Sequence, residues 1–386
     1  MCLLMAGPLY AQSHRKKDNV RQTDLIEVIV KTFNISVKEK HPDRKRVSFS
    51  IVPVSTTTSA GNKMLVSSIN AAFILGHKDS TKVSSLFLLP YTDFSENFGI
   101  GVKQNLWTPN NIWNIPGEFR FSNLSQYTYG LGSSSDETDR IKLNYKTIKF
   151  YMAANHKIVD HFFGGLGISY DRSYNISESE SGYVPSAFEK YKLGTTATSL
   201  ATGLNLSVLY DNRNNSINPD DGIYSSFVYR INPPWLANDY QWTSVYADFR
   251  QYFSMNHDKR RIFALWAIYW GSFGNVPYFN LPGTQLELGG RTGRGYTTAR
   301  YRGKHMLYFE TEYRFDITKN GLFGAVLFLN VQSLSELNTD QFQTLNPAAG
   351  FGARIKFNKE SKTNITFDFG FGRDSFNFYI GLGEFF

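Results

Sequence analysis

From about residue 46 onward, apolar and polar positions alternate with a period of two, the period of a β-strand. In 199–210, the even positions carry large or β-branched residues, and the odd positions from 199 to 207 carry small and polar ones. In 307–316, apolar and aromatic residues alternate with Tyr308, Glu310, Glu312, Arg314 and Asp316. Large apolar side chains outside and polar ones inside are expected when the surrounding solvent is lipid. A soluble sandwich would turn its charged face outward, so the pattern favours a transmembrane β-barrel.

The same alternation recurs along the chain and predicts an all-β fold, an antiparallel barrel of about 16 strands. An even strand number lets both ends of an antiparallel barrel meet and leaves no open edge in hydrocarbon. The predicted strands are 46–54, 63–75, 82–92, 98–107, 112–123, 141–155, 160–172, 197–210, 222–232, 240–254, 260–272, 304–316, 321–333, 347–358, 362–372 and 375–386.

The connections between these strands alternate in length. Those that follow even-numbered strands are short, and the longest of them is 211–221. Those that follow odd-numbered strands include the long segments 124–140, 173–196, 273–303 and 334–346. Short periplasmic turns and long extracellular loops are typical of outer-membrane barrels. The spacing therefore predicts a barrel over 46–386 in the outer membrane of a Gram-negative bacterium.

The N-terminal part of the chain has a different pattern. Residues 1–11 are apolar and are predicted to be a signal peptide, and 12–45 to be a periplasmic segment. Within that segment, 24–33 has apolar residues at helical spacing, with Asp24 and Glu27 placed as a capping box. This amphipathic helix has three possible locations: the barrel mouth, the inner-leaflet surface, or a partner protein.

Composition narrows the class further. Hydrophobic residues make up 41% of 386 and aromatic residues 16%, but no run approaches the roughly 20 apolar residues of a spanning helix. The net charge of +8 is dispersed, which favours a solvated tail or contact with lipid headgroups over nucleic acid. The only cysteine is Cys2, so cleavage of 1–11 would leave a chain without thiol chemistry, disulfides or cysteine-bound metals.

Signals for a soluble enzyme are weak. The glycine-rich stretch 289–295 lacks the Lys-Ser/Thr ending of a phosphate-binding loop. No histidines have metal-binding spacing, and Glu310 and Glu312 have no histidine or nucleophile beside them in sequence. We therefore expect no catalytic, cofactor or metal site and no enzymatic activity. A barrel-borne lipase stays open as an alternative, because a Ser-His pair need not be local in sequence.

Three stretches together resemble one family. Residues 288–296 (LGGRTGRGY), followed by Gly303 and 312–315 (EYRF), are similar to the signature of the BamA/TamA/FhaC outer-membrane assembly and secretion superfamily, the bacterial surface antigen family. Residues 210–222 resemble its turn after the eighth strand, and 364–386 resemble its last two strands. The resemblance covers 197–386 well, and 46–196 only by strand pattern.

The resemblance implies that the sixth extracellular loop folds back into the lumen. Gly293, Arg294, Gly295 and Tyr296 match the family's loop tip, with Arg294 as the lumenal arginine. Glu312 falls where the family places an acidic partner on the twelfth strand. A second acid usually comes from the thirteenth strand, where this chain has Asn330. We therefore expect an anchor that lacks one charge and is correspondingly weaker.

The last strand carries the remaining predicted site. We expect Phe378, Ile380, Leu382 and Phe386 to face outward and form a terminal targeting signal. Gly381 and Gly383 pack weakly and are expected to loosen the seam with the first strand.

Family members usually carry periplasmic POTRA domains, and 12–45 is too short for one. The resemblance thus implies insertion or secretion of outer-membrane proteins, with membrane lipid, client proteins and separate periplasmic proteins as partners. The alternatives are a passive diffusion channel and a barrel-borne lipase.

Overall fold

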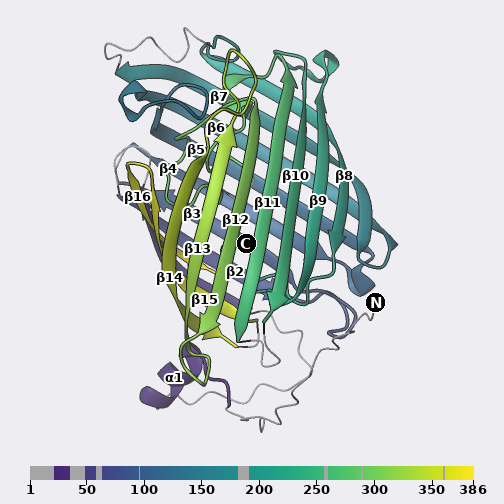
Figure 1. The fold of residues 1–386 in the computed structure, drawn as a ribbon. Coiled ribbons are helices and arrows are strands. Elements are labelled where there is room, and N and C mark those ends of the chain that lie inside the picture. Colours follow the sequence, from purple (N-terminus) through teal and green to yellow (C-terminus); the bar gives the residue numbers. More distant parts are fainter. Residues whose placement is uncertain are drawn as a thin grey trace, which may run out of the picture.

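The computed structural model describes residues 21–34, 48–57, 63–94, 96–180, 191–255, 260–287, 290–359 and 361–386. Neighbouring strands are antiparallel throughout, and from β1 to β16 each strand lies beside the next one in sequence (Figure 1 labels β2 to β16). Strand β1 also pairs with β16, so the strand order closes on itself. The prediction of an all-β antiparallel fold is confirmed. The strands are β1 Ser48–Thr57, β2 Lys63–Phe73, β3 Ser84–Thr92, β4 Phe98–Trp107, β5 Trp113–Thr128, β6 Ile141–Val159, β7 Phe162–Glu180, β8 Thr198–Asp211, β9 Gly222–Asn232, β10 Trp242–Ser254, β11 Arg261–Gly274, β12 His305–Asp316, β13 Phe323–Leu334, β14 Asn346–Asn358, β15 Thr363–Gly372 and β16 Ser375–Leu382.

Two sets of predicted strand ends are wrong. Strands β5, β6 and β7 run several residues beyond their predicted ends, and β6 and β7 still pair at Lys142 and Glu180. Residues 173–180 are largely polar on both faces, so the apolar alternation that guided the prediction is lost there while backbone pairing continues. Strand β16, in contrast, ends at Leu382 instead of continuing to 386.

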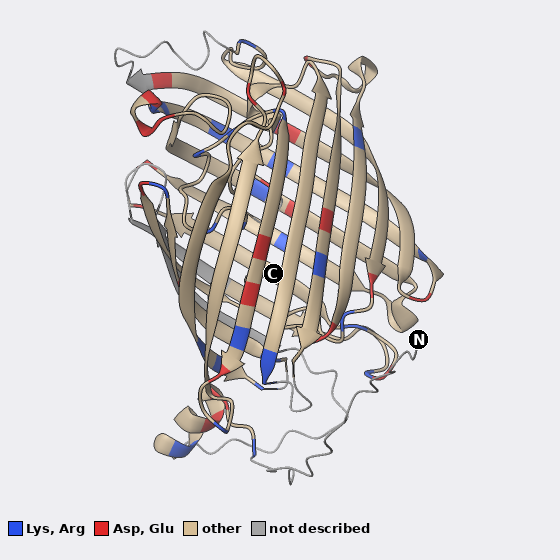
Figure 2. Cartoon of the chain, viewed as in Figure 1, with Lys and Arg blue, Asp and Glu red and all other residues tan. Residues whose placement is uncertain are grey.

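Side chains on the strands follow the predicted alternation. On β12, Tyr308, Glu310, Glu312 and Arg314 are buried inside the barrel, whereas Leu307 and Phe309 are more than 40% exposed on its outer face. Figure 2 marks the positions of Lys, Arg, Asp and Glu along the strands, and many of these side chains are buried, among them Glu118, Asp171, Asp248, Arg354 and Asp368. The barrel therefore has an apolar exterior and a charged interior.

One end of the barrel is covered by packed loops. The connection between β11 and β12 joins a buried cluster that includes Tyr191, Trp242, Tyr278 and Leu281. Backbone bridges link Arg302 to Gly132 and to Gly283, so that loops distant in sequence support one another. In the described parts of the connections, four short 3-10 helices lie at Pro109–Asn111, Glu137–Asp139, Pro234–Leu236 and Tyr278–Asn280.

The single described α-helix, α1 Leu25–Thr32, lies at the opposite end (Figure 1). Asp24 caps it by accepting a hydrogen bond from the backbone N–H of Glu27 at 2.8 Å. The second Asp24 oxygen accepts from the backbone N–H of Lys359 at 2.9 Å, and Lys359 Nζ lies 2.9 Å from Glu27 Oε2. Of the three locations left open by the sequence, the structure has the helix docked at a barrel end. Among the described residues, no helix is long and apolar enough to cross a membrane.

We expect α1 to leave the barrel in acid. Lys359 and, to a smaller extent, Lys31 and Arg21 lower the pKa of Glu27 below its ordinary value. Because the pKa of Glu27 is lowered in the docked state, ionised Glu27 stabilises docking of the helix. This stabilisation is complete above the ordinary carboxyl pKa and is lost as pH falls through the lowered value. The measurement is the anisotropy of a dye on Phe33→Cys, in a Cys2→Ser background, between about pH 7 and pH 3.

Lys359→Gln removes the ion pair with Glu27, so the dye should already show low anisotropy at neutral pH. Lys319→Gln is the matched control, since Lys319 lies in a turn at the same end and has no described contact with α1. Equal anisotropy for the two variants at every pH would show that the Glu27–Lys359 pair does not hold the helix.

Candidate functional site

The connection between β11 and β12, residues 275–303 and hereafter the inner loop, returns into the lumen after passing through the loop cover. Its tip is a turn in which Gly293 has φ 66° and Gly295 has φ 107°, a region that favours glycine. A Cβ on Gly295 would lie 3.1 Å from the Phe371 carbonyl carbon and 3.2 Å from Gly372 N. Glycine thus lets the tip lie directly against the backbone of β15. Residues 288–289 of the motif lie outside the described residues.

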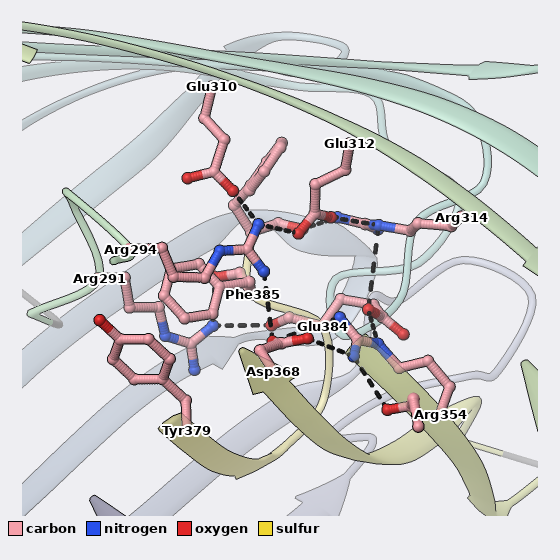
Figure 3. A network of polar contacts seen from close by, with 12 residues as sticks. Arg291, Arg294, Glu310, Glu312, Arg314, Arg354, Asp368, Tyr379, Glu384 and Phe385 are labelled. Carbon is pink, nitrogen blue, oxygen red and sulfur yellow. Dashed lines mark hydrogen bonds and ion pairs between the residues drawn. The ribbon is translucent and has the colours of Figure 1, made fainter. Parts of the chain in front are cut away.

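The tip presents Arg294, whose side chain is fully buried, to carboxylates from two strands (Figure 3). Arg294 Nη2 bonds both Glu310 and Glu312 on β12. Arg294 Nη1 donates to Asp368 Oδ2 on β15 at 3.2 Å. A guanidinium suits this position because its planar fork can serve several acceptors and does not lose its charge. The inner loop is therefore bound to two separate strands of the barrel wall, β12 and β15.

Two aromatic rings enclose the same guanidinium. Its central carbon lies 3.6 Å from the centre of the Phe328 ring on β13 and 4.0 Å from the centre of the Phe385 ring. Cation–π attraction is strongest at desolvated sites such as this. Asn330 does not reach the guanidinium: its Nδ2 donates instead to the Arg294 backbone carbonyl at 2.8 Å.

The arginine network extends beyond Arg294. Arg314 bonds Glu312 at 2.6 Å, and Arg354 bridges Asp368 at 2.7 Å and Glu384 at 2.8 Å. Its members balance four guanidinium groups against four carboxylates, which offsets the large cost of burying charge. They are Arg291, Arg294, Arg314, Arg354, Glu310, Glu312, Asp368 and Glu384.

Residues 384–386, which follow β16, add further contacts to the arginine network. After β16, Gly383 has φ 82°, and the chain turns inward there. Arg291 Nη1 donates to the carbonyls of Glu384 and Phe385 at 2.8 and 2.6 Å. Phe386 packs on Trp266, with ring centres 5.1 Å apart, and its backbone oxygen accepts a hydrogen bond from Arg314 at 2.8 Å. We call residues 383–386 the C-terminal tail.

This tail corrects the predicted targeting strand. Phe386 and Leu382 are buried, and Glu384 also points inward, whereas the period-two pattern placed all three outward. Phe378, Ile380 and Gly381 remain in β16 and pair with Phe369, Phe367 and Thr366 of β15. The left-handed backbone at Gly383 interrupts the alternation, so residues after it cannot be assigned to a face by counting.

The predicted loop residues come together as a unit, but the predicted partner set was incomplete. Gly293, Arg294, Gly295 and Tyr296 form the tip with Glu312 as one partner; Tyr296 donates from its hydroxyl to the Pro347 carbonyl at 2.7 Å. The acid missing at Asn330 is replaced by Glu310 and Asp368, so the expectation of a single acidic partner is wrong. Both carry a sequence signal, since each lies on the inward face of its strand.

A family model decides the identity of the fold. The model described as the Omp85 superfamily domain matches residues 55–386. The chain belongs to the Omp85 superfamily. No functionally curated protein matches this sequence significantly.

Solved structures with this Omp85 fold include BamA from Haemophilus ducreyi lacking POTRA domains 1–3, at 13% identity and TM-score 0.58. The match covers 88% of this chain and 70% of that one. CdiB from Acinetobacter baumannii matches at 10% identity and TM-score 0.56, over 88% of this chain and 60% of its own. CdiB from Escherichia coli matches at 10% identity and TM-score 0.54, over 88% and 67%.

At these identities, the likeness shows the fold of the Omp85 chain and not its activity. Within the described residues, no group of three His, Cys, Asp or Glu side chains could hold a metal ion. The chemistry that the site displays is a buried, charge-balanced clamp between the inner loop, β12, β15 and the C-terminal tail.

Proposed function

We propose that this Omp85 barrel lies in the outer membrane of a Gram-negative bacterium and takes part in inserting or secreting proteins there. Members of the superfamily are outer-membrane barrels. The exposed apolar side chains of the strands suit a lipid environment, and the charged interior suits an aqueous lumen. The end covered by long loops would face outward, and the end that holds α1 would face the periplasm.

The observation that favours insertion is the short seam between β1 and β16. Among the described residues, one pair, Thr56 with Tyr379, registers these strands. By comparison, β15 and β16 remain in register from Ile365–Leu382 to Gly372–Ser375. The inward turn at Gly383 removes the last residues of the chain from this pairing. A weakly paired seam can open toward lipid and offer strand edges to a client by β-augmentation.

The arginine network supports the same proposal by making one part of the wall rigid. It ties β12, β14 and β15 to the inner loop and to the C-terminal tail. Opening is then concentrated at the neighbouring seam. Secretion through the lumen would require the inner loop to leave the lumen, and this would break all the contacts of Arg294.

The two alternatives have less support. A passive channel needs a continuous aqueous path, whereas the loops at one end pack into a buried apolar cluster and the inner loop enters the lumen. A lipase needs a serine activated by histidine, and within the described ranges no serine hydroxyl is hydrogen-bonded to a histidine ring.

The test is to lock the seam with a disulfide. Continuing the antiparallel register by one residue from the Thr56–Tyr379 pair opposes backbone positions 55 and 380, so the seam pair is Ser55→Cys with Ile380→Cys. Directly opposed strand residues have Cα separations that a disulfide spans. In a Cys2→Ser background, the reduced protein in proteoliposomes should speed the folding of a small urea-denatured client barrel, and the oxidised protein should not.

A matched disulfide at Phe121 and Ile148, which face each other on β5 and β6, is the control and should leave client folding unchanged. If the oxidised seam variant inserts clients as fast as its reduced form, opening at the seam is not the mechanism. If neither form exceeds empty liposomes, insertion itself is excluded.

A further inference from the structure

A polar pocket of about 250 Å³ lies at the end of the barrel where α1 docks. Its walls come from the ends of β11 to β15, the turns beside them, and Gln22 just before the helix. Six of its lining residues are cationic and three are acidic, so its walls have a net charge of +3. The charged residues are Arg260, Arg314, Arg354, Lys356, Lys359 and Lys362, with Asp220, Asp316 and Glu384.

Most of these cations have partners. Lys362 Nζ lies 2.6 Å from Asp220 Oδ2, and Lys359 pairs with Glu27 of α1. Arg260 lies 3.4 Å from Asp316, and Arg354 is engaged by Asp368 and Glu384. The acidic side chains of the pocket are therefore already neutralised.

Two donors of the pocket have no partner among the residues that the structure describes. The Lys356 ammonium forms no ion pair or hydrogen bond with any residue that the structure describes, although its backbone N–H donates to the Leu322 carbonyl at 2.8 Å. Arg314 Nη1 is buried without a hydrogen-bond partner, and the Arg314 side chain is only 6% exposed. A buried unpaired donor is costly, so an acceptor supplied from outside would be favourable here.

We propose that this pocket binds the carboxylate of an acidic segment of a partner protein. A carboxylate accepts hydrogen bonds from a guanidinium and from an ammonium, and Arg314 and Lys356 supply both. The pocket is large enough for one acidic side chain. Its walls are inward-facing and end-facing residues, away from the exposed apolar exterior, which favours a protein over a lipid headgroup as the source of the anion.

The segment of sequence that contains α1 also carries a net positive charge. Residues 12–47 contain ten Lys and Arg against five Asp and Glu. An excess of positive charge attracts anionic partners over several ångströms and raises their rate of encounter. An acidic segment of this kind would belong to a partner of the function proposed above. The inference rests on that function only in placing the pocket on the periplasmic side of the membrane.

The test measures binding on the purified full chain in detergent micelles. The probe is a fluorescein-labelled decaglutamate peptide, followed by anisotropy, with decaglutamine as the uncharged comparison. Lys356→Gln should weaken decaglutamate binding by about fivefold, as expected for the loss of roughly 1 kcal/mol. Lys356→Arg should retain most of the affinity, and Lys356→Met repeats the charge loss with a different side chain.

Lys78→Gln is the matched control, because it removes the same charge from an exposed turn at the same end without touching the pocket. Its affinity should stay within about twofold of the unsubstituted protein. An equal loss in Lys78→Gln and Lys356→Gln would reveal general attraction to a basic surface and overturn the proposal. So would the absence of saturable decaglutamate binding.

Two further arms separate the sources of the anion. Inorganic phosphate and vesicles containing an anionic phospholipid are tested with the same variants. If their binding depends on Lys356 and that of decaglutamate does not, the pocket is a phosphate site and the proposal is wrong. Because no client is inserted in these measurements, failure here leaves the seam experiment unaffected, and failure of that experiment leaves this one interpretable.

Discussion

Replacing Arg294 by alanine should destabilise the barrel by about 3–5 kcal/mol, the range for breaking a buried ion pair by removing one partner. Glu310 is the carboxylate most affected, because Glu312 keeps Arg314 and Asp368 keeps Arg354. The measurements are the urea midpoint from tryptophan fluorescence and the rate of protease cleavage within 275–303. Both should change together, since the same contacts hold the loop and the wall.

The companion variants separate charge from geometry. Arg294→Lys should recover little, because an ammonium cannot serve three carboxylates while lying flat between Phe328 and Phe385. Exchanging the charges of Arg294 and Glu312 should also fail, since the new acid would face Glu310 and Asp368. Arg294→Met with Glu310→Gln should recover part of the stability by removing the stranded charge. Unchanged cleavage and an unchanged midpoint in Arg294→Ala would rule out the anchor.

The second large effect is expected from Phe386→Ala, at about 3–4 kcal/mol, typical of truncating a buried aromatic side chain. Phe386 is 4% exposed and packs between Trp266 and Tyr252. The stability of protein refolded in detergent is the measurement, because it does not depend on cellular targeting. Phe376→Ala is the control: the same truncation on the same final segment, but of a side chain that is 55% exposed.

A deficit of Phe386→Ala in the outer membrane with normal stability after refolding would contradict the packing role. It would favour the terminal targeting signal expected from the sequence. Equal destabilisation by Phe386→Ala and Phe376→Ala would show that the C-terminal tail contributes nothing specific.

The sequence was sufficient for those features that repeat locally. The alternation of apolar and polar residues predicts Glu310, Glu312 and Arg314 on one face of β12, and in the structure all three side chains are buried inside the barrel. The helix near Asp24 was visible from its apolar spacing and its cap. Such signals are local, because a strand or helix in lipid or water must turn one set of side chains toward each solvent.

The partners of Arg294 were not visible in the same way. Asp368 is 74 residues away from Arg294, and no spacing rule links a loop tip to a particular strand across a lumen. Asn330 indicates a missing charge only if the acids are expected on β12 and β13 alone; the structure supplies the further carboxylate from β15, at Asp368. The expected outward orientation of Phe386 was wrong because one residue, Gly383, takes a left-handed backbone conformation after the last regular strand.

The position of the C-terminal tail also has a consequence for the order of folding. Arg294 faces carboxylates from β12 and β15 and a ring from the last residues, so its environment is complete only when the final segment of the chain has arrived. Contacts between residues this distant in sequence form slowly. A partly assembled barrel would contain uncompensated lumenal charges, which disfavours stable intermediates. Docking of residues 383–386 should therefore act as the commitment step, after which the barrel matures in a single cooperative event.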